Sequence, residues 1–242
     1  AVTQFGVAGD GARRMVAPDG TVYREYYGTG WQRGLVTTAK VFANATDEAS
    51  NIAQKTTAIT WTQDDTNLAY EKNPRMTETN VSDAAGNNRR VTFGYTTFTR
   101  PSGALCALPS DTNEFNGLSL YRHTHQGWQQ LDSGYLSRSF IGLLNEVDVY
   151  DASSGAEVLV SKSTFTYDLG GEFRVVTNPS NDTVTQHDPA YDSNFAYRGN
   201  VSKAFRYDVV NDPNNLNNTA AESQSGYNSS GSVVFDKLIQ II

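Results

Sequence analysis

The sequence has little cysteine and few positive charges, and each shortage excludes a class of protein. Of its 242 residues only Cys106 is a cysteine, so no internal disulfide framework can form. Lysine and arginine total 19 against 26 aspartates and glutamates, which gives a formal net charge of −7. Because nucleic-acid binding needs a clustered cationic face, we predict no nucleic-acid partner. No apolar run reaches the roughly 18 residues that a membrane-spanning helix needs, so we also predict no membrane span.

Motifs that carry catalysis are also missing. The chain has no nucleophile elbow, no phosphate-binding loop and no zinc-protease helix motif. His187 and Asp188 are adjacent, and neighbouring strand residues point to opposite faces, so they do not suit a base and its orienting partner. A turn before Pro189 accounts for them. We predict that the protein is not an enzyme.

Two groups of side chains have the chemistry of metal ligands. His123 and His125 would share one face of a strand, but no third ligand is evident near them. Asp64, Asp65 and Asn67 offer the hard oxygens that Ca²⁺ prefers, without the regular alternation of a calcium-binding loop. We therefore predict no metal site and no cofactor.

The sequence is rich in residues that build short strands and turns. Its 20 glycines, with many Asn and Ser residues, favour turns, whereas Thr, Val, Phe and the 13 tyrosines favour a pleated sheet. Four segments share one layout, which begins at a turn residue and then alternates polar with apolar residues. These segments are residues 34–42, 74–83, 142–151 and 199–208.

Each of these strands has a partner strand that runs back beside it. Residues 90–95 and 162–168 return after turns rich in Asp and Gly, and residues 55–61 are the partner of the first strand. The repeated unit is therefore a β-hairpin, with unequal insertions between the starts at 34, 74, 142 and 199.

The sequence thus predicts one all-β region over residues 1–242. We expect a winding antiparallel sheet of repeated β-hairpins, forming part of a shell or a solenoid-like wall. Residues 103–116 and 211–218 are predicted loops, and one helical turn is expected within residues 46–54.

Tyr-Asp pairs stand at matching points of these hairpins. They are Tyr150-Asp151, Tyr167-Asp168 and Tyr207-Asp208, the last preceded by Arg198-Gly199-Asn200. This pattern resembles the Rhs/YD-repeat family of bacterial proteins. The resemblance implies a β-sheet that spirals into a hollow shell, as in the C component of insecticidal toxin complexes and in teneurins. It also implies a secreted or cell-surface location. The self-cleavage motif of the family is not matched, because the steps Asp188-Pro189 and Asp212-Pro213 have different neighbours.

The function predicted from these features is a non-catalytic structural wall or scaffold. One alternative is a surface adhesin or glycan-binding module, in which Trp31, Trp61, Trp128 and the tyrosines form a sugar-stacking face. Another alternative is a shell fragment of a toxin-delivery protein. Buried aromatic residues would favour the wall, and aromatic residues exposed on one sheet face would favour the adhesin.

The last segment of the sequence, residues 232–242, predicts an assembly strand. It is strongly apolar, and an uncovered edge of this kind pairs readily with another strand. The partner would be a strand of its own sheet, a second copy, or a neighbouring segment of the same polypeptide. The residues concerned are Val233, Val234, Phe235, Leu238, Ile239, Ile241 and Ile242.

Overall fold

The computed structural model describes residues 4–7, 11–129, 132–170, 173, 196–209, 219–227 and 233–240. Its strands are β1 Gln4–Val7, β2 Arg13–Val16, β3 Val22–Tyr27, β4 Val36–Phe42, β5 Lys55–Thr62, β6 Arg75–Asp83, β7 Asn88–Thr99, β8 Leu105–Asn116, β9 Ser119–Trp128, β10 Leu144–Asp151, β11 Val158–Tyr167, β12 Val201–Tyr207, β13 Thr219–Tyr227 and β14 Val233–Gln240. The short helices are η1 Gly30–Gln32, α1 Ala45–Ala49 and α2 Ser133–Ser137. Over the described ranges, no helix has the length and apolar character needed to cross a membrane.

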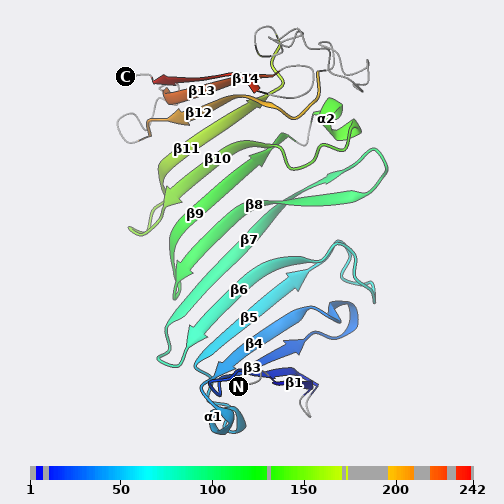
Figure 1. The fold of residues 1–242 in the computed structure, drawn as a ribbon, viewed down its shortest axis with the longest axis vertical. Coiled ribbons are helices and arrows are strands. Elements are labelled where there is room, and N and C mark those ends of the chain that lie inside the picture. The colour runs from blue at the N-terminus through cyan, green and yellow to red at the C-terminus, as the bar shows by residue number, and fades with distance from the viewer. Residues whose placement is uncertain are drawn as a thin grey trace. The chain divides into compact units, whose positions relative to one another are not determined.

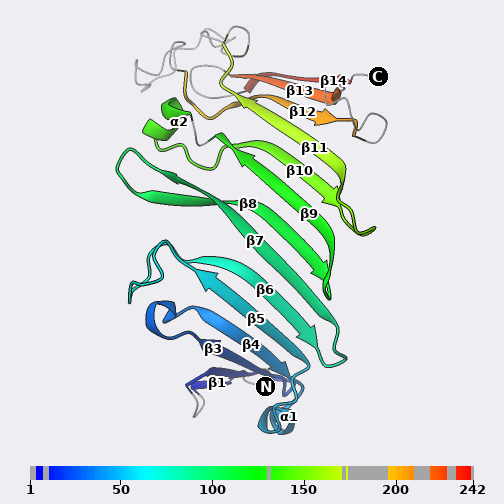
Figure 2. The same ribbon diagram turned by 180° about the vertical axis from the view of Figure 1, so that it is seen from behind.

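The fourteen strands follow one another in the sheet in chain order, so each strand pairs with its neighbours in sequence (Figures 1 and 2). Paired strands run antiparallel, as in β5 with β6 and β10 with β11. The predicted all-β fold of successive hairpins is confirmed. Contacts divide the chain into two compact units. The first is Ala1–Gly94 with Asp111–Arg122 and Ser153–Gly155, and the second is Tyr95–Ser110 with His123–Ala152 and Ala156–Ile242.

The four predicted repeat strands correspond to β4, β6, β10 and β12, and the predicted helical turn overlaps α1. The predicted loop at 103–116 is wrong, because most of it is the long strand β8. Pro109, Asp111 and Asn113 are poor strand formers, and they suggested a loop. The sheet accepts them because its strand faces are only partly buried, so polar side chains keep contact with solvent. The predicted loop at 211–218 lies outside the described residues.

A β-bulge with an aromatic residue recurs along the sheet. The aromatic residue lies at or next to the end of a strand and pairs with the start of the next strand, and this arrangement occurs at six strands. Each bulge leaves one residue of the next strand unpaired and increases the local twist. The aromatic residues are Tyr27, Trp61, Tyr150, Tyr167, Tyr207 and Tyr227.

Three of these aromatic side chains also donate a hydrogen bond to a main-chain carbonyl of the preceding strand. Trp61 Nε1 donates to the carbonyl of Val36 at 2.8 Å, and Tyr167 Oη donates to that of Leu144 at 2.7 Å. Tyr227 Oη donates to the carbonyl of Val201 at 2.9 Å. Each acceptor is the first residue of the preceding strand, so the ring satisfies a main-chain carbonyl where the ladder begins.

The hydrophobic core is small. Among the residues described, seven hydrophobic side chains are buried: Ala12, Val22, Phe42, Phe98, Tyr135, Ala152 and Val209. Most strand residues are half-buried on both faces of the sheet, as in β6, where every residue before Asp83 is of intermediate exposure. A sheet covered by a second layer would instead alternate buried with exposed residues.

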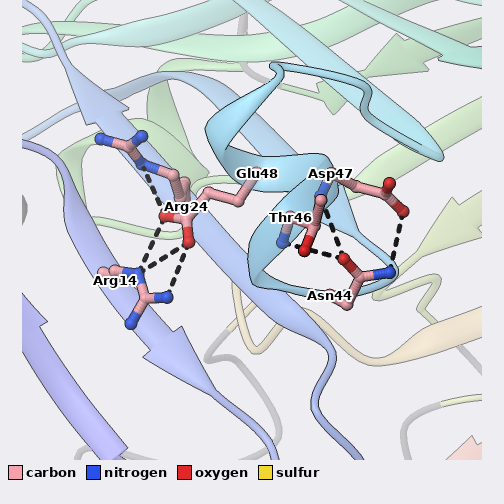
Figure 3. Close-up of polar contacts among 6 residues, drawn as sticks. All are labelled: Arg14, Arg24, Asn44, Thr46, Asp47 and Glu48. Carbon is pink, nitrogen blue, oxygen red and sulfur yellow. Dashed lines mark hydrogen bonds and ion pairs between the residues drawn. The ribbon is translucent and has the colours of Figure 1, made fainter.

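Helix α1 neutralises a row of cations in the first unit. Arg14, Arg24 and Lys40 face one another on adjacent strands, and like charges in such register repel. Glu48 of α1 contacts the two arginines: Arg14 Nε donates to Glu48 Oε1 at 2.8 Å, and Arg24 Nε lies 3.7 Å from the same oxygen (Figure 3). The ring of Tyr26 lies beneath Arg24 and Lys40, 5.2 and 5.8 Å from its centre.

The start of α1 is fixed by Asn44. Its Oδ1 accepts hydrogen bonds from the main-chain N–H groups of Thr46 at 2.9 Å and Asp47 at 3.0 Å, the arrangement of a helix N-cap (Figure 3). A helix of five residues is unstable alone, so this cap and the contacts of Glu48 hold it on the sheet.

Replacing Glu48 by alanine should therefore lower the free energy of unfolding of the first unit by about 2 kcal/mol, because Arg14 and Arg24 lose their counter-ion. Asp47→Ala is the matched control, since the Asp47 carboxylate contacts Asn44 at the exposed surface of the same helix. We expect that control to lose less than about 0.5 kcal/mol. Urea denaturation followed by circular dichroism measures both changes, and equal losses would contradict the role of Glu48.

Candidate functional site

Asp168 closes the long segment that follows β11. Its backbone has a left-handed φ of 51°, and its carboxylate accepts four hydrogen bonds. Oδ2 accepts from Tyr135 Oη at 2.8 Å and from the N–H groups of Arg198 at 2.8 Å and Gly199 at 2.7 Å, and Oδ1 accepts from the N–H of Asn200 at 3.1 Å. The Asp168 N–H in turn donates to the Asn200 carbonyl at 2.9 Å. One side chain thus holds the two ends of the segment together.

Aromatic rings surround the hydrogen bonds of Asp168. Tyr135 of α2 is 4% exposed, and its ring centre lies 5.0 Å from Tyr197 and 6.4 Å from Tyr167, in edge-to-face contacts. Burial, and next the hydrogen bond to Asp168, raise the pKa of Tyr135 strongly, so its hydroxyl stays a donor. Gly134 allows this packing, since a Cβ at that position would overlap the Tyr197 ring.

A groove of about 460 Å³ opens beside this cluster. Its lining includes the aromatic residues Phe165, Tyr167 and Tyr197 and the amide residues Gln129 and Asn145. These residues come from the end of β9, the start of β10, the end of β11 and the chain leading into β12, and all belong to the second unit. The volume lies in the range of small-molecule sites.

One polar atom of the groove residues lacks a partner. Asn145 Oδ1 is buried and has no hydrogen-bond partner among the described residues. An unpaired buried amide oxygen costs about 1–3 kcal/mol. The position of this side chain depends on Gly127, where a Cβ would lie 2.5 Å from Asn145 Oδ1.

A second polar cluster lies on β10 and β11. Lys162 Nζ lies 3.0 Å from both carboxylate oxygens of Asp148 and 2.8 Å from Glu146 Oε2. Asp148 and Lys162 are 6% and 8% exposed. Burial raises the pKa of the Asp148 carboxyl, which the hydrogen bond from Lys162 opposes. Burial also lowers the pKa of Lys162, but its hydrogen bonds to Glu146 and Asp148 outweigh burial and raise that pKa overall.

The two metal-ligand candidates are engaged in other contacts. His123 Nδ1 lies 3.1 Å from Glu157 Oε2, and its ring stacks on Tyr150 with centres 5.3 Å apart. Asp64 pairs with Arg75, and Asp65 Oδ1 accepts from the N–H of Asn67 at 3.0 Å. Within the described part of the chain, no group of three His, Cys, Asp or Glu side chains could hold a metal ion. His187 and Asp188 lie outside it.

The structure brings one set of the predicted motif residues together. Asp168 meets Arg198, Gly199 and Asn200 through the hydrogen bonds given above, although Arg198 lies 30 positions further along the chain. Tyr167 pairs with Val201, the residue that follows Asn200. Tyr150, Asp151, Tyr207 and Asp208 lie at the ends of β10 and β12 and take no part in this groove. Sequence reasoning missed Gln129, Tyr135, Asn145 and Tyr197, because their meeting depends on the return of a distant segment.

The predicted assembly residues form β14, which pairs with β13. Leu238 is 75% exposed and Val233 is 57% exposed, while Phe235 and Ile239 are half-buried. Ile241 and Ile242 lie outside the described residues. One edge of β14 therefore pairs within its own sheet, which is one of the outcomes expected from the sequence.

Comparison with known proteins gives little. No protein-family model matches the chain. No curated protein matches it. Eight chains of solved structure match, among them a porin-like protein from Bacteroides uniformis with a TM-score of 0.32 and 11% sequence identity. That match covers 98% of this chain and 86% of the other.

The resemblance to the Rhs/YD-repeat family is therefore wrong. No family model matches the chain, that of the Rhs/YD repeat included. The physical reason lies in the motif. The tyrosines mark strand ends opposite β-bulges, and of the three aspartates only Asp168 is held by the Arg198–Asn200 backbone. The Tyr-Asp pairs are thus not one repeated turn.

Proposed function

We propose that the chain is a non-catalytic β-sheet wall of a secreted or surface-exposed bacterial protein. The observation that carries the proposal is that both faces of the strands are half-buried, with a small hydrophobic core. The recurring bulge and aromatic residue support it, because they give six strand pairs the same local geometry and let strands add one after another.

A wall of this kind extends through its edge strands, and β14 has the properties of a docking edge. In the strand order it follows β13 and has no further neighbour among the described strands. Leu238 and Val233 expose apolar surface on it. Strand addition satisfies a free main-chain edge, so we propose that β14 pairs with a second copy or with a neighbouring segment of the same polypeptide.

Leu238→Lys tests this edge, because a lysine on an edge strand opposes pairing with another strand. We expect the wild-type chain to form species larger than its 26.5 kDa monomer and the variant to be monomeric in light scattering after size exclusion. Leu118→Lys is the matched control, since Leu118 is 93% exposed between β8 and β9 and should leave assembly unchanged.

Deleting residues 238–242 should have the same effect while circular dichroism still reports the upstream strands. A wild-type chain that stays monomeric at every accessible concentration would contradict assembly through β14.

A further inference from the structure

We propose that the groove formed by Gln129, Asn145, Phe165, Tyr167 and Tyr197 binds a neutral carbohydrate. The inference goes beyond the wall function and rests on a different observation, the chemistry of this groove in the second unit. It assigns the chain a ligand-binding site in addition to its structural role.

The charge of the groove argues against an ionic ligand. No lysine, arginine or histidine is among the described residues that line it, so an anion would find no counter-ion. Its two carboxylates are committed to the protein: Asp168 accepts four hydrogen bonds, and Asp132 accepts from the N–H of Gly134 at 2.8 Å as the cap of α2. A cation would therefore compete with existing donors for both carboxylates.

The remaining groups suit a ring that carries hydroxyl groups. Phe165, Tyr167 and Tyr197 offer aromatic surface, on which the apolar C–H face of a pyranose can pack. Gln129 and Asn145 offer amides, which both donate and accept hydrogen bonds, as two adjacent hydroxyl groups do.

The groove is also pre-formed. Asp168 fixes the chain that carries Tyr197, and the Tyr167 hydroxyl is anchored on the Leu144 carbonyl at 2.7 Å. Arg138 lies over the Tyr197 ring at 4.9 Å and donates to the Gly134 carbonyl at 3.1 Å, which restrains that ring. Little conformational entropy is then lost on binding.

Titration calorimetry of the full chain with maltotriose, cellotriose and mannotriose tests the proposal. We expect at least one of these neutral trisaccharides to bind with a dissociation constant of about 1 mM or tighter. Choline chloride and glucuronic acid serve as a cationic and an anionic probe, and we expect no binding of either.

Gln129→Ala and Tyr197→Ala should each weaken trisaccharide binding at least tenfold. Tyr70→Ala is the matched aromatic control: Tyr70 is 64% exposed and belongs to the first unit, so binding should be unchanged. Thermal unfolding of every variant shows whether it folds, and Gln129→Ala keeps the test decisive if Tyr197→Ala does not.

Three results would overturn the inference. One is the absence of heat from all three trisaccharides at about 10 mM. The second is binding of choline or glucuronic acid in their place, which would assign an ionic ligand. The third is trisaccharide binding that survives Gln129→Ala but is lost in Tyr70→Ala, which would place the site elsewhere. None of these results bears on assembly through β14, so the two proposals fail separately.

Discussion

Replacing Asp168 by alanine should lower the free energy of unfolding of the second unit by about 3 kcal/mol. The change leaves three main-chain N–H groups and the Tyr135 hydroxyl without their acceptor. Each buried donor without a partner costs about 1–3 kcal/mol, and water reaches some of them after local opening, which keeps the sum near the lower end. Tyr197 should also become mobile, because its segment is no longer held to β11. Urea denaturation followed by circular dichroism measures the loss.

Asp83→Ala is the matched control for this prediction. Asp83 Oδ1 also accepts from main-chain N–H groups, those of Ala85 at 3.0 Å and Asn87 at 2.9 Å, but in an exposed hairpin turn. Water can replace the lost acceptor there, so we expect a clearly smaller loss than in Asp168→Ala. If Asp168→Ala were no more destabilising than Asp83→Ala, the hydrogen bonds of Asp168 would not be what holds the two ends of the 168–200 segment together.

The strands were predictable from the sequence because their signals are local. Alternation in residues 142–151 placed Leu144, Glu146, Asp148 and Tyr150 on one face, and the register of β10 with β11 agrees, since Asp148 faces Lys162. The strand β8 was not predictable by this means. Its polar residues and Pro109 suggest a loop, and only the half-buried environment of the sheet explains why they are tolerated.

The groove was predictable only in part. Tyr167, Asp168 and the Arg198–Asn200 stretch were singled out as a repeated motif, although the family resemblance built on them is wrong. Their actual relation is a contact across a long insertion, and its geometry depends on the left-handed backbone of Asp168. Likewise, a bulge cannot be read from one strand, because it is set by the register of the next.

Replacing Lys162 by methionine should be the most destabilising single change on β10 and β11, with a loss of about 3–5 kcal/mol near pH 7. Methionine keeps the apolar stem but removes the only cation that contacts both Glu146 and Asp148 among the contacts described. The buried carboxylate of Asp148, beside the partly exposed Glu146, then remains without compensation. Lys203→Met is the matched control: its ion pair with Glu222, at 2.9 Å, is more open to solvent, and we expect a loss below about 1 kcal/mol.

The loss in Lys162→Met should depend on pH in a defined direction. Burial already raises the pKa of Asp148, and Lys162 is the neighbour that lowers it. Without Lys162, the pKa of Asp148 should therefore rise further. A carboxyl whose folded pKa exceeds its unfolded value favours the folded state at low pH and loses that stability as pH rises through the folded pKa. The deficit of the variant should therefore be smaller at pH 4 than at pH 7.

In the wild type, the raised pKa of Lys162 gives stability that is present below the ordinary lysine value of 10.5 and lost as pH rises above it. Denaturant titrations at pH 4, 7 and 11 measure both effects, and a deficit that is equal at pH 4 and pH 7 would show that Asp148 does not carry the uncompensated charge.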